Sequence, residues 1–280
     1  YEMQRSLVGS EMCIRDSFWR IKEVPAKYFK RIVPYWPLAG WLTGGIMVGV
    51  LWVTAQVLPI SIAWLLAILS RLLITGCLHE DGLADFFDGF GGGTTKERTL
   101  AIMKDSQIGS YGVIGLIGYF LLLFLLLENL PLKLICALVI CGDCWSKFCA
   151  SQIINYLPYA RKEEDSKAKV VYDRMTWQEL LTGFICGLLP IVLFLPIDFW
   201  PVTLCPILTF IILYRLMKRR LQGYTGDCCG AAFLLCELSF YLGAVILLYA
   251  HIRYGNPDFI NAYLKSVSYT HLRAHETTLH

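Results

Sequence analysis

Seven long apolar stretches constrain the fold of this chain more than any other feature. They cover residues 38–58, 59–77, 111–127, 132–154, 177–195, 201–217 and 231–250. A helix needs about 20 apolar residues to cross a hydrocarbon layer of about 30 Å. Only 17% of the residues are charged, compared with about 25% in soluble domains. The sequence therefore predicts an all-α, polytopic membrane bundle of about seven transmembrane helices, and excludes a soluble enzyme, a disordered chain and a nucleic-acid-binding protein.

The positive charges lie on one side of this predicted bundle. Seven spans place residues 18–37, 78–110, 155–176 and 218–230 on one side, and the turns near residue 59, at 128–131 and at 196–200 on the other. The first set holds sixteen lysines and arginines, and the second holds none. Loops rich in lysine and arginine stay in the cytoplasm. We therefore expect a multi-pass protein whose polar, active-site loops face the cytoplasm.

The two ends differ from the rest of the chain. Residues 1–17 and 266–280 share no apolar periodicity with their neighbours and resemble translated sequencing-adapter read-through. We expect both to be non-native and exclude them from functional reasoning. This leaves one membrane domain, residues 18–265, and removes three of the five histidines from consideration as metal ligands.

Three carboxylates follow the second apolar stretch directly. Asp81, Asp85 and Asp88 stand at i, i+4 and i+7, which places them on one face of a helix. Like charges at this spacing repel, so a helix carrying them needs a compensating cation. Oxygen ligands favour Mg²⁺ or Mn²⁺ over zinc, and carboxylate-held Mg²⁺ commonly binds phosphates. The sequence predicts a magnesium site here, and the competing interpretation is a solvated helix end at the membrane surface.

A glycine-rich stretch comes next. Residues 89–93 contain four glycines, so we expect the helix to stop there, because glycines permit positive φ and close backbone approach. Together with the cations Arg98 and Lys104, such a stretch can cradle a phosphate, although flexible loops have the same composition. Asp105 is then either a further metal ligand or the cap of a helix that begins near Ile108.

Several polar side chains lie inside or beside the later spans. Asp143 and Lys147 are i, i+4, which predicts either a self-neutralising ion pair or a substrate contact by Lys147. Glu237 lies about two turns into the last span, where an unpaired carboxylate is costly. We expect it to face a polar cavity or a partner, and Arg71 is either such a partner or extends to the membrane surface. Thr225 has the position either of a helix cap or of a substrate ligand.

An ordered set of motifs spans about residues 25–250. It comprises Trp36-Pro-Leu-Ala-Gly40, Thr75-Gly-Cys-Leu-His-Glu-Asp-Gly-Leu-Ala-Asp85, Asp88-Gly89, Arg98, Met103, Asp105-Ser106, Gly109, Tyr159-Ala-Arg161, Gly223-Tyr-Thr-Gly-Asp227, Gly230-Ala231 and Glu237. These motifs resemble those of the adenosylcobinamide-GDP ribazoletransferases, the cobalamin synthase family, and the His-x-Asp-Gly-Leu-Ala-Asp core is highly specific. One departure is Lys147, which stands where members often have arginine and lacks its bidentate geometry toward phosphate.

The resemblance implies an enzyme of the cytoplasmic membrane that joins adenosylcobinamide-GDP to α-ribazole, or to its 5′-phosphate, and releases GMP with the help of Mg²⁺. A hydroxyl attacks a pyrophosphate phosphorus in this reaction, and a divalent metal neutralises the developing charge. The implied metal ligands are Asp81, Asp85, Asp88 and Asp105, and the implied catalytic residues are Asp81, His79 and Asp85, with the general base undecided. The implied substrate-binding residues are Arg98, Lys104, Ser106, Lys147, Arg161, Thr225, Asp227 and Glu237. The implied partners are the two substrates, the lipid bilayer and other cobalamin-assembly enzymes.

Three other classes of protein share parts of this pattern. A CDP-alcohol phosphotransferase also clusters aspartates on membrane helices, but Asp85 stands where its motif has an arginine. An aspartate-rich prenyltransferase carries two acidic motifs, and this chain has one. A transporter places acids near the middle of its spans, and only Asp143 and Glu237 fit that description.

Overall fold

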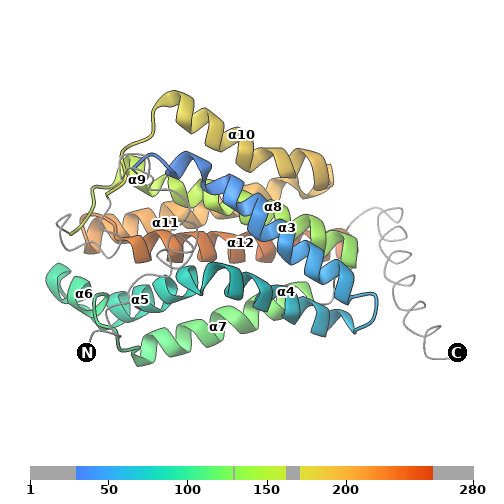
Figure 1. The fold of residues 1–280 in the computed structure, drawn as a ribbon, viewed down its shortest axis with the longest axis horizontal. Helices are drawn as coiled ribbons and strands as arrows, with labels where there is room; N and C mark the ends of the chain where they lie inside the picture. The colour runs from blue at the N-terminus through green and yellow to red at the C-terminus, as the bar shows by residue number, and fades with distance from the viewer. Residues whose placement is uncertain (1–29, 129, 162–170, 255–280) are drawn as a thin grey trace, which may run out of the picture.

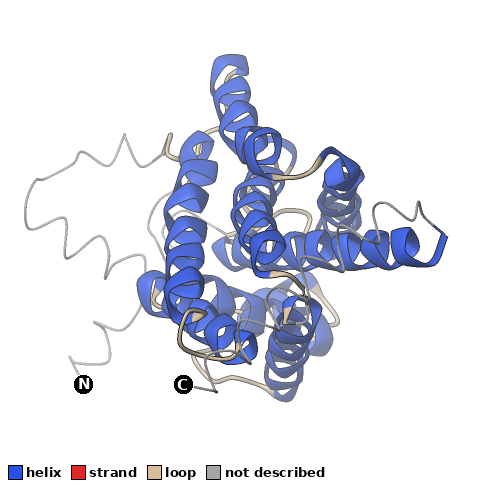
Figure 2. Ribbon diagram, turned by 90° about the vertical axis from the view of Figure 1, so that its right-hand side faces the viewer, coloured by secondary structure: helices blue, strands red, loops and turns tan. Residues whose placement is uncertain are grey.

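The computed structural model describes residues 30–128, 130–161 and 171–254, so the two ends predicted to be non-native lie outside the described residues. All regular elements within this part are helical (Figure 2). They are η2 (Val33–Tyr35), α3 (Trp36–Thr54), α4 (Ile60–Thr75), α5 (Leu78–Gly92), α6 (Lys96–Ile102), α7 (Ser110–Leu127), α8 (Leu132–Ser151), α9 (Ile153–Tyr156), α10 (Trp177–Phe194), η4 (Ile197–Thr203), α11 (Leu204–Arg220) and α12 (Gly226–Tyr254). The prediction of an all-α polytopic membrane protein is confirmed.

Six helical segments are individually long and apolar enough to cross a membrane. They contain α3, α7, α8, α10, α11 and α12. The predicted second span corresponds to α4, which has only 16 residues. It reaches the required length only together with α5, to which it is joined at an angle of 89°. The count is therefore seven if this bent pair is taken as one span.

The polar segments gather at one end of the bundle. Figure 1 shows α6 and α9 at that end and the turn between α3 and α4 at the other. Arg161 follows α9, and its guanidinium lies 3.8 Å from Asp227 at the start of α12 and donates to Leu100 O of α6. Segments far apart in sequence thus meet where the charge pattern predicted a common side.

Small residues allow α3 and α8 to approach closely. A Cβ on Gly40 of α3 would lie 2.9 Å from Cys144 Cα of α8, and one on Gly44 would lie 3.2 Å from Ile140 Cα. Glycines at such a contact bring backbones close enough for extensive van der Waals packing, which drives helix association in lipid. The same contact brings Asp143 against α3, where a Cβ on Gly40 would lie 3.1 Å from Asp143 Oδ1.

The acidic helix ends within the glycine-rich stretch, as expected, but no glycine there has a positive φ. The acidic helix α5 continues to Gly92, and the only positive-φ residues among those described are Gly76, Cys77 and Gln222. The glycines serve packing instead: a Cβ on Gly89 would lie 2.4 Å from Met103 Cγ, and one on Gly91 would lie 2.5 Å from Tyr111 Cγ. The expected end of the helix is confirmed and the glycines do permit close approach, whereas the expected positive φ is wrong, because none of them reverses the backbone.

Candidate functional site

The acidic helix α5 lies against the beginning of α12. A Cβ on Gly82 would lie 3.1 Å from Asp227 Cα, and one on Gly230 would lie 3.2 Å from His79 Cα. Each helix thus contributes a glycine where the backbone of the other passes. This crossing brings the His-Glu-Asp-Gly segment of α5 beside the Thr-Gly-Asp segment that starts α12, two motifs nearly 150 residues apart in the sequence.

Asp88 holds the start of α7. Its two carboxylate oxygens accept hydrogen bonds from the backbone N–H groups of Gly109, at 2.7 Å, and Gly112, at 2.8 Å. The first N–H groups of a helix lack partners inside the helix and carry partial positive charge, so a carboxylate there is favourable. Asp88 thus shares the predicted acidic face but is the anchor between α5 and α7, while its predicted role as a metal ligand stays a prediction.

Replacing this anchor should cost stability. In Asp88→Asn the amide keeps one acceptor but brings N–H donors against a backbone donor, and the charge-assisted bonds are lost. We expect a loss of about 2 kcal/mol in the free energy of unfolding, measurable as a lower midpoint of thermal unfolding in detergent. Asp105→Asn is the matched control, because Asp105 is exposed and its carboxylate accepts a local bond from Gln107 N, at 3.1 Å. Equal stability of the two variants would contradict the anchoring role.

Asp81 and Asp85 lie one turn apart on α5 and are less buried than Asp88. Asp81 is exposed and Asp85 is half-buried. No group of three or more histidine, cysteine, aspartate or glutamate side chains is close enough to hold a metal within the part of the chain that is described. Protein-bound Mg²⁺ usually needs only one or two carboxylates, with substrate phosphates and water completing its octahedron. The pair Asp81 and Asp85 fits that donor set, whereas a cage built entirely from protein does not.

A buried arginine side chain lies near this acidic helix. The Arg161 side chain is only 6% exposed, yet its Nε has no hydrogen-bond partner among the described residues. The guanidinium donates to Leu100 O at 3.3 Å and lies 3.8 Å from Asp227 Oδ2. Since Asp227 packs against Gly82, the structure brings Arg161 and Asp227 to the crossing of α5 and α12. Arginine here supplies a positive charge with a fork of donors, which suits phosphate oxygens.

The loop before α12 is held by the loop after α9. Ala160 N donates to Tyr224 O at 2.8 Å, and Tyr224 N donates to Pro158 O at 3.0 Å. Burial raises the pKa of the Tyr224 phenol well above its usual range, so this side chain stays neutral. Thr225 then caps α12, because its Oγ1 accepts from Cys228 N at 3.3 Å. The capping interpretation of Thr225 is confirmed, and the cap fixes the position of Asp227.

The remaining candidates between α5 and α7 point to solvent. Arg98, Lys104, Asp105 and Ser106 are all exposed. Arg98 lies in the first turn of α6, where its backbone N–H is capped by Thr95 Oγ1 at 3.2 Å. The structure therefore places these four predicted residues along one accessible segment at the polar end of the bundle, whereas the side chain of Arg161 is buried.

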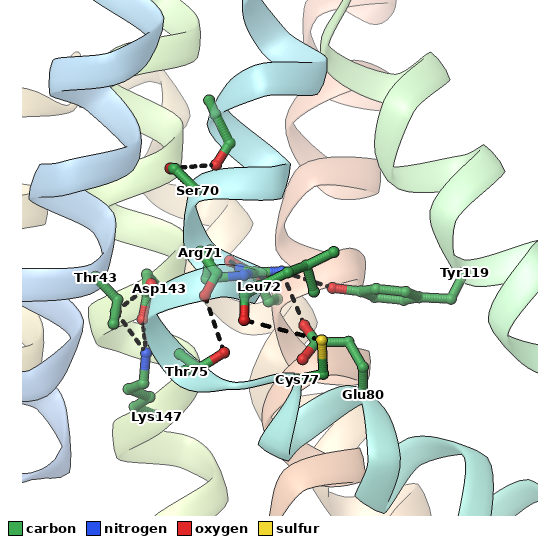
Figure 3. Close-up of polar contacts among 12 residues, drawn as sticks. Thr43, Ser70, Arg71, Leu72, Thr75, Cys77, Glu80, Tyr119, Asp143 and Lys147 are labelled. Atoms are coloured by element: carbon green, nitrogen blue, oxygen red, sulfur yellow. Dashed lines mark hydrogen bonds and ion pairs between the residues drawn. The ribbon is translucent and has the colours of Figure 1, made fainter. Parts of the chain in front are cut away.

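A buried ion pair links helices near the α4–α5 bend. Nη1 of Arg71 contacts both carboxylate oxygens of Glu237, at 2.6 and 2.7 Å. Nη2 of Arg71 donates to Tyr119 Oη at 2.8 Å (Figure 3). Tyr241 Oη donates to the same Glu237 at 2.8 Å. Glu80 lies 3.9 Å from Arg71. The expected partnership of Arg71 and Glu237 is confirmed, and it explains how Glu237 is tolerated at 0% exposure.

A second buried pair stands beside the first. Lys147 Nζ contacts Asp143 Oδ1 and donates to Thr43 Oγ1 at 3.0 Å, while Thr43 donates to Asp143 Oδ2 at 2.8 Å (Figure 3). The ammonium also lies 4.2 Å from the ring centroid of Phe233, and the Phe233 and His79 ring centroids are 4.8 Å apart. The predicted intrahelical ion pair is confirmed. The contacts of this ion pair occupy the Lys147 ammonium. The role of Lys147 in substrate binding stays a prediction.

Comparisons with known proteins identify the family of this chain. The family model described as cobalamin-5-phosphate synthase matches residues 17–245. This chain belongs to that family. An adenosylcobinamide-GDP ribazoletransferase of Shewanella amazonensis is 39% identical over 225 residues, which cover 76% of this chain and 84% of the relative. The enzyme of the same name from Leptothrix cholodnii is 38% identical over 218 residues, covering 75% and 82%. No solved structure matches.

The match to the cobalamin-5-phosphate synthase family covers every motif described above. The matched range includes the acidic helix, the loop that carries Arg161 and the start of α12.

Sequence reasoning missed Tyr119 and Tyr241, which complete the contacts of Arg71 and Glu237, because nothing in their local sequence distinguishes them from other membrane aromatics. It also missed a specific role for Arg220, although the basic run 218–220 at a helix end was visible.

Proposed function

We propose that this chain is an adenosylcobinamide-GDP ribazoletransferase, which joins adenosylcobinamide-GDP to α-ribazole, or to its 5′-phosphate, and releases GMP. The observation that carries the proposal is the exposed Asp81 and the half-buried Asp85, one turn apart on a helix whose Gly82 packs against Asp227, the ion-pair partner of the buried Arg161. A metal ligand set and a fixed cation together can neutralise the charge of the pyrophosphate that the hydroxyl attacks. The names and coverage of the relatives support the same reaction.

Asp81 and Asp85 would hold Mg²⁺, which when bound neutralises charge on the pyrophosphate oxygens. Arg161 orients a phosphate through a guanidinium whose position is fixed by Leu100 O and Asp227. The exposed residues Arg98, Lys104 and Ser106 are suited to the outer parts of the nucleotide, because they line the accessible segment between α5 and α7. Catalysis in this arrangement is positioning and electrostatic stabilisation, as in other phosphoryl transfers.

The carboxylate face, rather than His79, is the better candidate to take the proton of the attacking hydroxyl. Residues two apart on a helix point to nearly opposite sides, so His79 and Asp81 diverge. The His79 ring packs edge-on against Phe233 of α12, and its Nδ1 is buried without a hydrogen-bond partner in the described part of the chain. A general base must come within hydrogen-bond reach of the hydroxyl, and on the carboxylate face Asp81 is exposed and Asp85 is half-buried.

The orientation that we propose places the polar end of the bundle in the cytoplasm of the producing cell. The one-sided distribution of lysine and arginine supports it. In a chain stripped of native cysteines, the variant Thr95→Cys should resist a membrane-impermeant thiol reagent in intact cells and react after permeabilisation. Thr95 is exposed, so burial does not limit the reaction. Labelling of the Thr95→Cys variant from outside intact cells would contradict the proposed topology.

The reaction itself is tested by following GMP release from membranes that contain the chain. Release should require adenosylcobinamide-GDP, α-ribazole and Mg²⁺ together, and should match the amount of joined product. Omission of α-ribazole separates transfer from simple hydrolysis. GMP release that continues unchanged without α-ribazole, or joined product without Mg²⁺ or Mn²⁺, would contradict the proposed activity.

A further inference from the structure

The C-terminal end of the acidic helix α5 is not closed by a left-handed residue. Gly93 donates its N–H to Gly89 O at 2.9 Å but is extended, with φ −86° and ψ 126°, rather than in the left-handed conformation that often closes a helix. The last turn of α5 also holds no lysine or arginine. The final carbonyl groups of a helix have no partner within the helix and carry partial negative charge. They therefore need donors from elsewhere.

Arg220 supplies these donors from the end of α11. Its Nη2 contacts Gly93 O and donates to Phe90 O at 3.3 Å. Its guanidinium carbon lies 5.7 Å from the centroid of the Phe90 ring, within cation–π range. Phe90 in turn stacks on Phe86 of the preceding turn, with ring centroids 4.3 Å apart. One side chain thus satisfies two carbonyls and covers an aromatic ring of α5.

The opposite end of α5 is joined to α4 by a sharp turn. Gly76 and Cys77 both have positive φ, 60° and 59°, and the two helices meet at 89°. A non-glycine residue such as Cys77 is strained in that conformation, so the turn persists only if its surroundings hold it. The first turns of α5 are held on α12 through Gly82 and Gly230. Arg220 provides the corresponding hold at the far end.

We propose that Arg220 is a positioning residue that clamps α5 to the segment joining α11 and α12. The clamp fixes the acidic helix relative to Thr225 and to Asp227 at the start of α12, so that Asp81 and Asp85 keep a constant position relative to Arg161. The consequence for catalysis rests on the proposed function, whereas the clamp itself does not.

Three variants separate positioning from net charge. Arg220→Gln removes the cation, Arg220→Lys keeps a charge but loses the planar fork of donors, and Arg219→Gln removes an adjacent arginine whose side chain is exposed. We expect Arg220→Gln to lower kcat about 10-fold to 100-fold and to raise the half-saturating Mg²⁺ concentration several-fold, with little change in KM for α-ribazole. Arg220→Lys should be intermediate, and Arg219→Gln should match the unmodified chain.

Amide hydrogen exchange of the purified full chain tests whether Arg220 holds the end of α5, independently of any enzyme activity. Arg220→Gln should speed exchange in residues 86–93 while leaving α8 unchanged, and Arg219→Gln should change neither. Unchanged exchange in residues 86–93, or equally faster exchange in every helix, would overturn the proposal. If Arg220→Gln does not fold, Arg220→Lys compared with Arg219→Gln decides in the same way. A chain that never releases GMP would refute the proposed function, and the exchange result would still decide on Arg220.

Discussion

Replacing Asp81 by asparagine should lower the rate of GMP release about 100-fold or more while leaving the protein folded and inserted. Asparagine has nearly the same shape, but it removes the negative charge that a divalent cation requires. Metal stabilisation of phosphoryl transfer is worth several kcal/mol, and each 1.4 kcal/mol is about tenfold in rate. Asp81 is exposed, so the fold does not depend on burial of its carboxylate.

The matched control is Asp173→Asn. Asp173 is another exposed carboxylate, and it lies 4.0 Å from the exposed Arg31. Exposed pairs of this kind contribute little to stability. We expect Asp173→Asn to retain full activity, and His79→Gln to lose less activity than Asp81→Asn. Near-normal GMP release by Asp81→Asn at ordinary Mg²⁺ concentrations would show that Asp81 is not a metal ligand.

Replacing Glu237 by glutamine should have the largest effect on stability. The change leaves the Arg71 guanidinium buried at 1% exposure without its closest counter-charge. Breaking one partner of a buried ion pair typically costs about 3–5 kcal/mol. We expect a strongly lowered thermal midpoint in detergent and poor recovery of inserted protein, before any question of catalysis arises.

The double variant Arg71→Gln/Glu237→Gln distinguishes this structural role from substrate binding. Removing both charges leaves neither member of the pair as an unpaired ion, so the double variant should be more stable than Glu237→Gln alone. If Glu237 instead bound substrate, Glu237→Gln would keep the stability of the unmodified chain and change KM. Additive losses of stability from the two single changes would contradict the paired role.

Much of this architecture could be predicted because membrane helices leave a simple signal. Apolar stretches of the right length locate the spans, and the cost of a charge in lipid predicts that Glu237 needs a partner such as Arg71. The i, i+4 spacing of Asp143 and Lys147 likewise depends only on helix geometry. These predictions were confirmed because each rests on local periodicity or on a large energy.

What could not be predicted depends on contacts between distant segments. The glycines at residues 89–93 look alike in the sequence, yet they are required by Met103, Tyr111 and Thr99 rather than by a turn. Asp88 shares the acidic face of Asp81 and Asp85, and only the position of α7 assigns it to backbone N–H groups. Arg220 lies in a basic run that is equally well explained as a solvated helix end on the lysine- and arginine-rich side of the membrane. Tertiary packing, not local pattern, decides each of these roles.

Binding of Mn²⁺, followed by electron paramagnetic resonance on the purified chain, tests the central claim that the carboxylate face of α5 holds a divalent cation. With adenosylcobinamide-GDP present, the unmodified chain should bind about one Mn²⁺ at an oxygen-ligand site, and Mg²⁺ should displace it. The double variant Asp81→Asn/Asp85→Asn should lose this binding, and Asp173→Asn should retain it. Equal Mn²⁺ binding by the double variant and the unmodified chain would contradict the account.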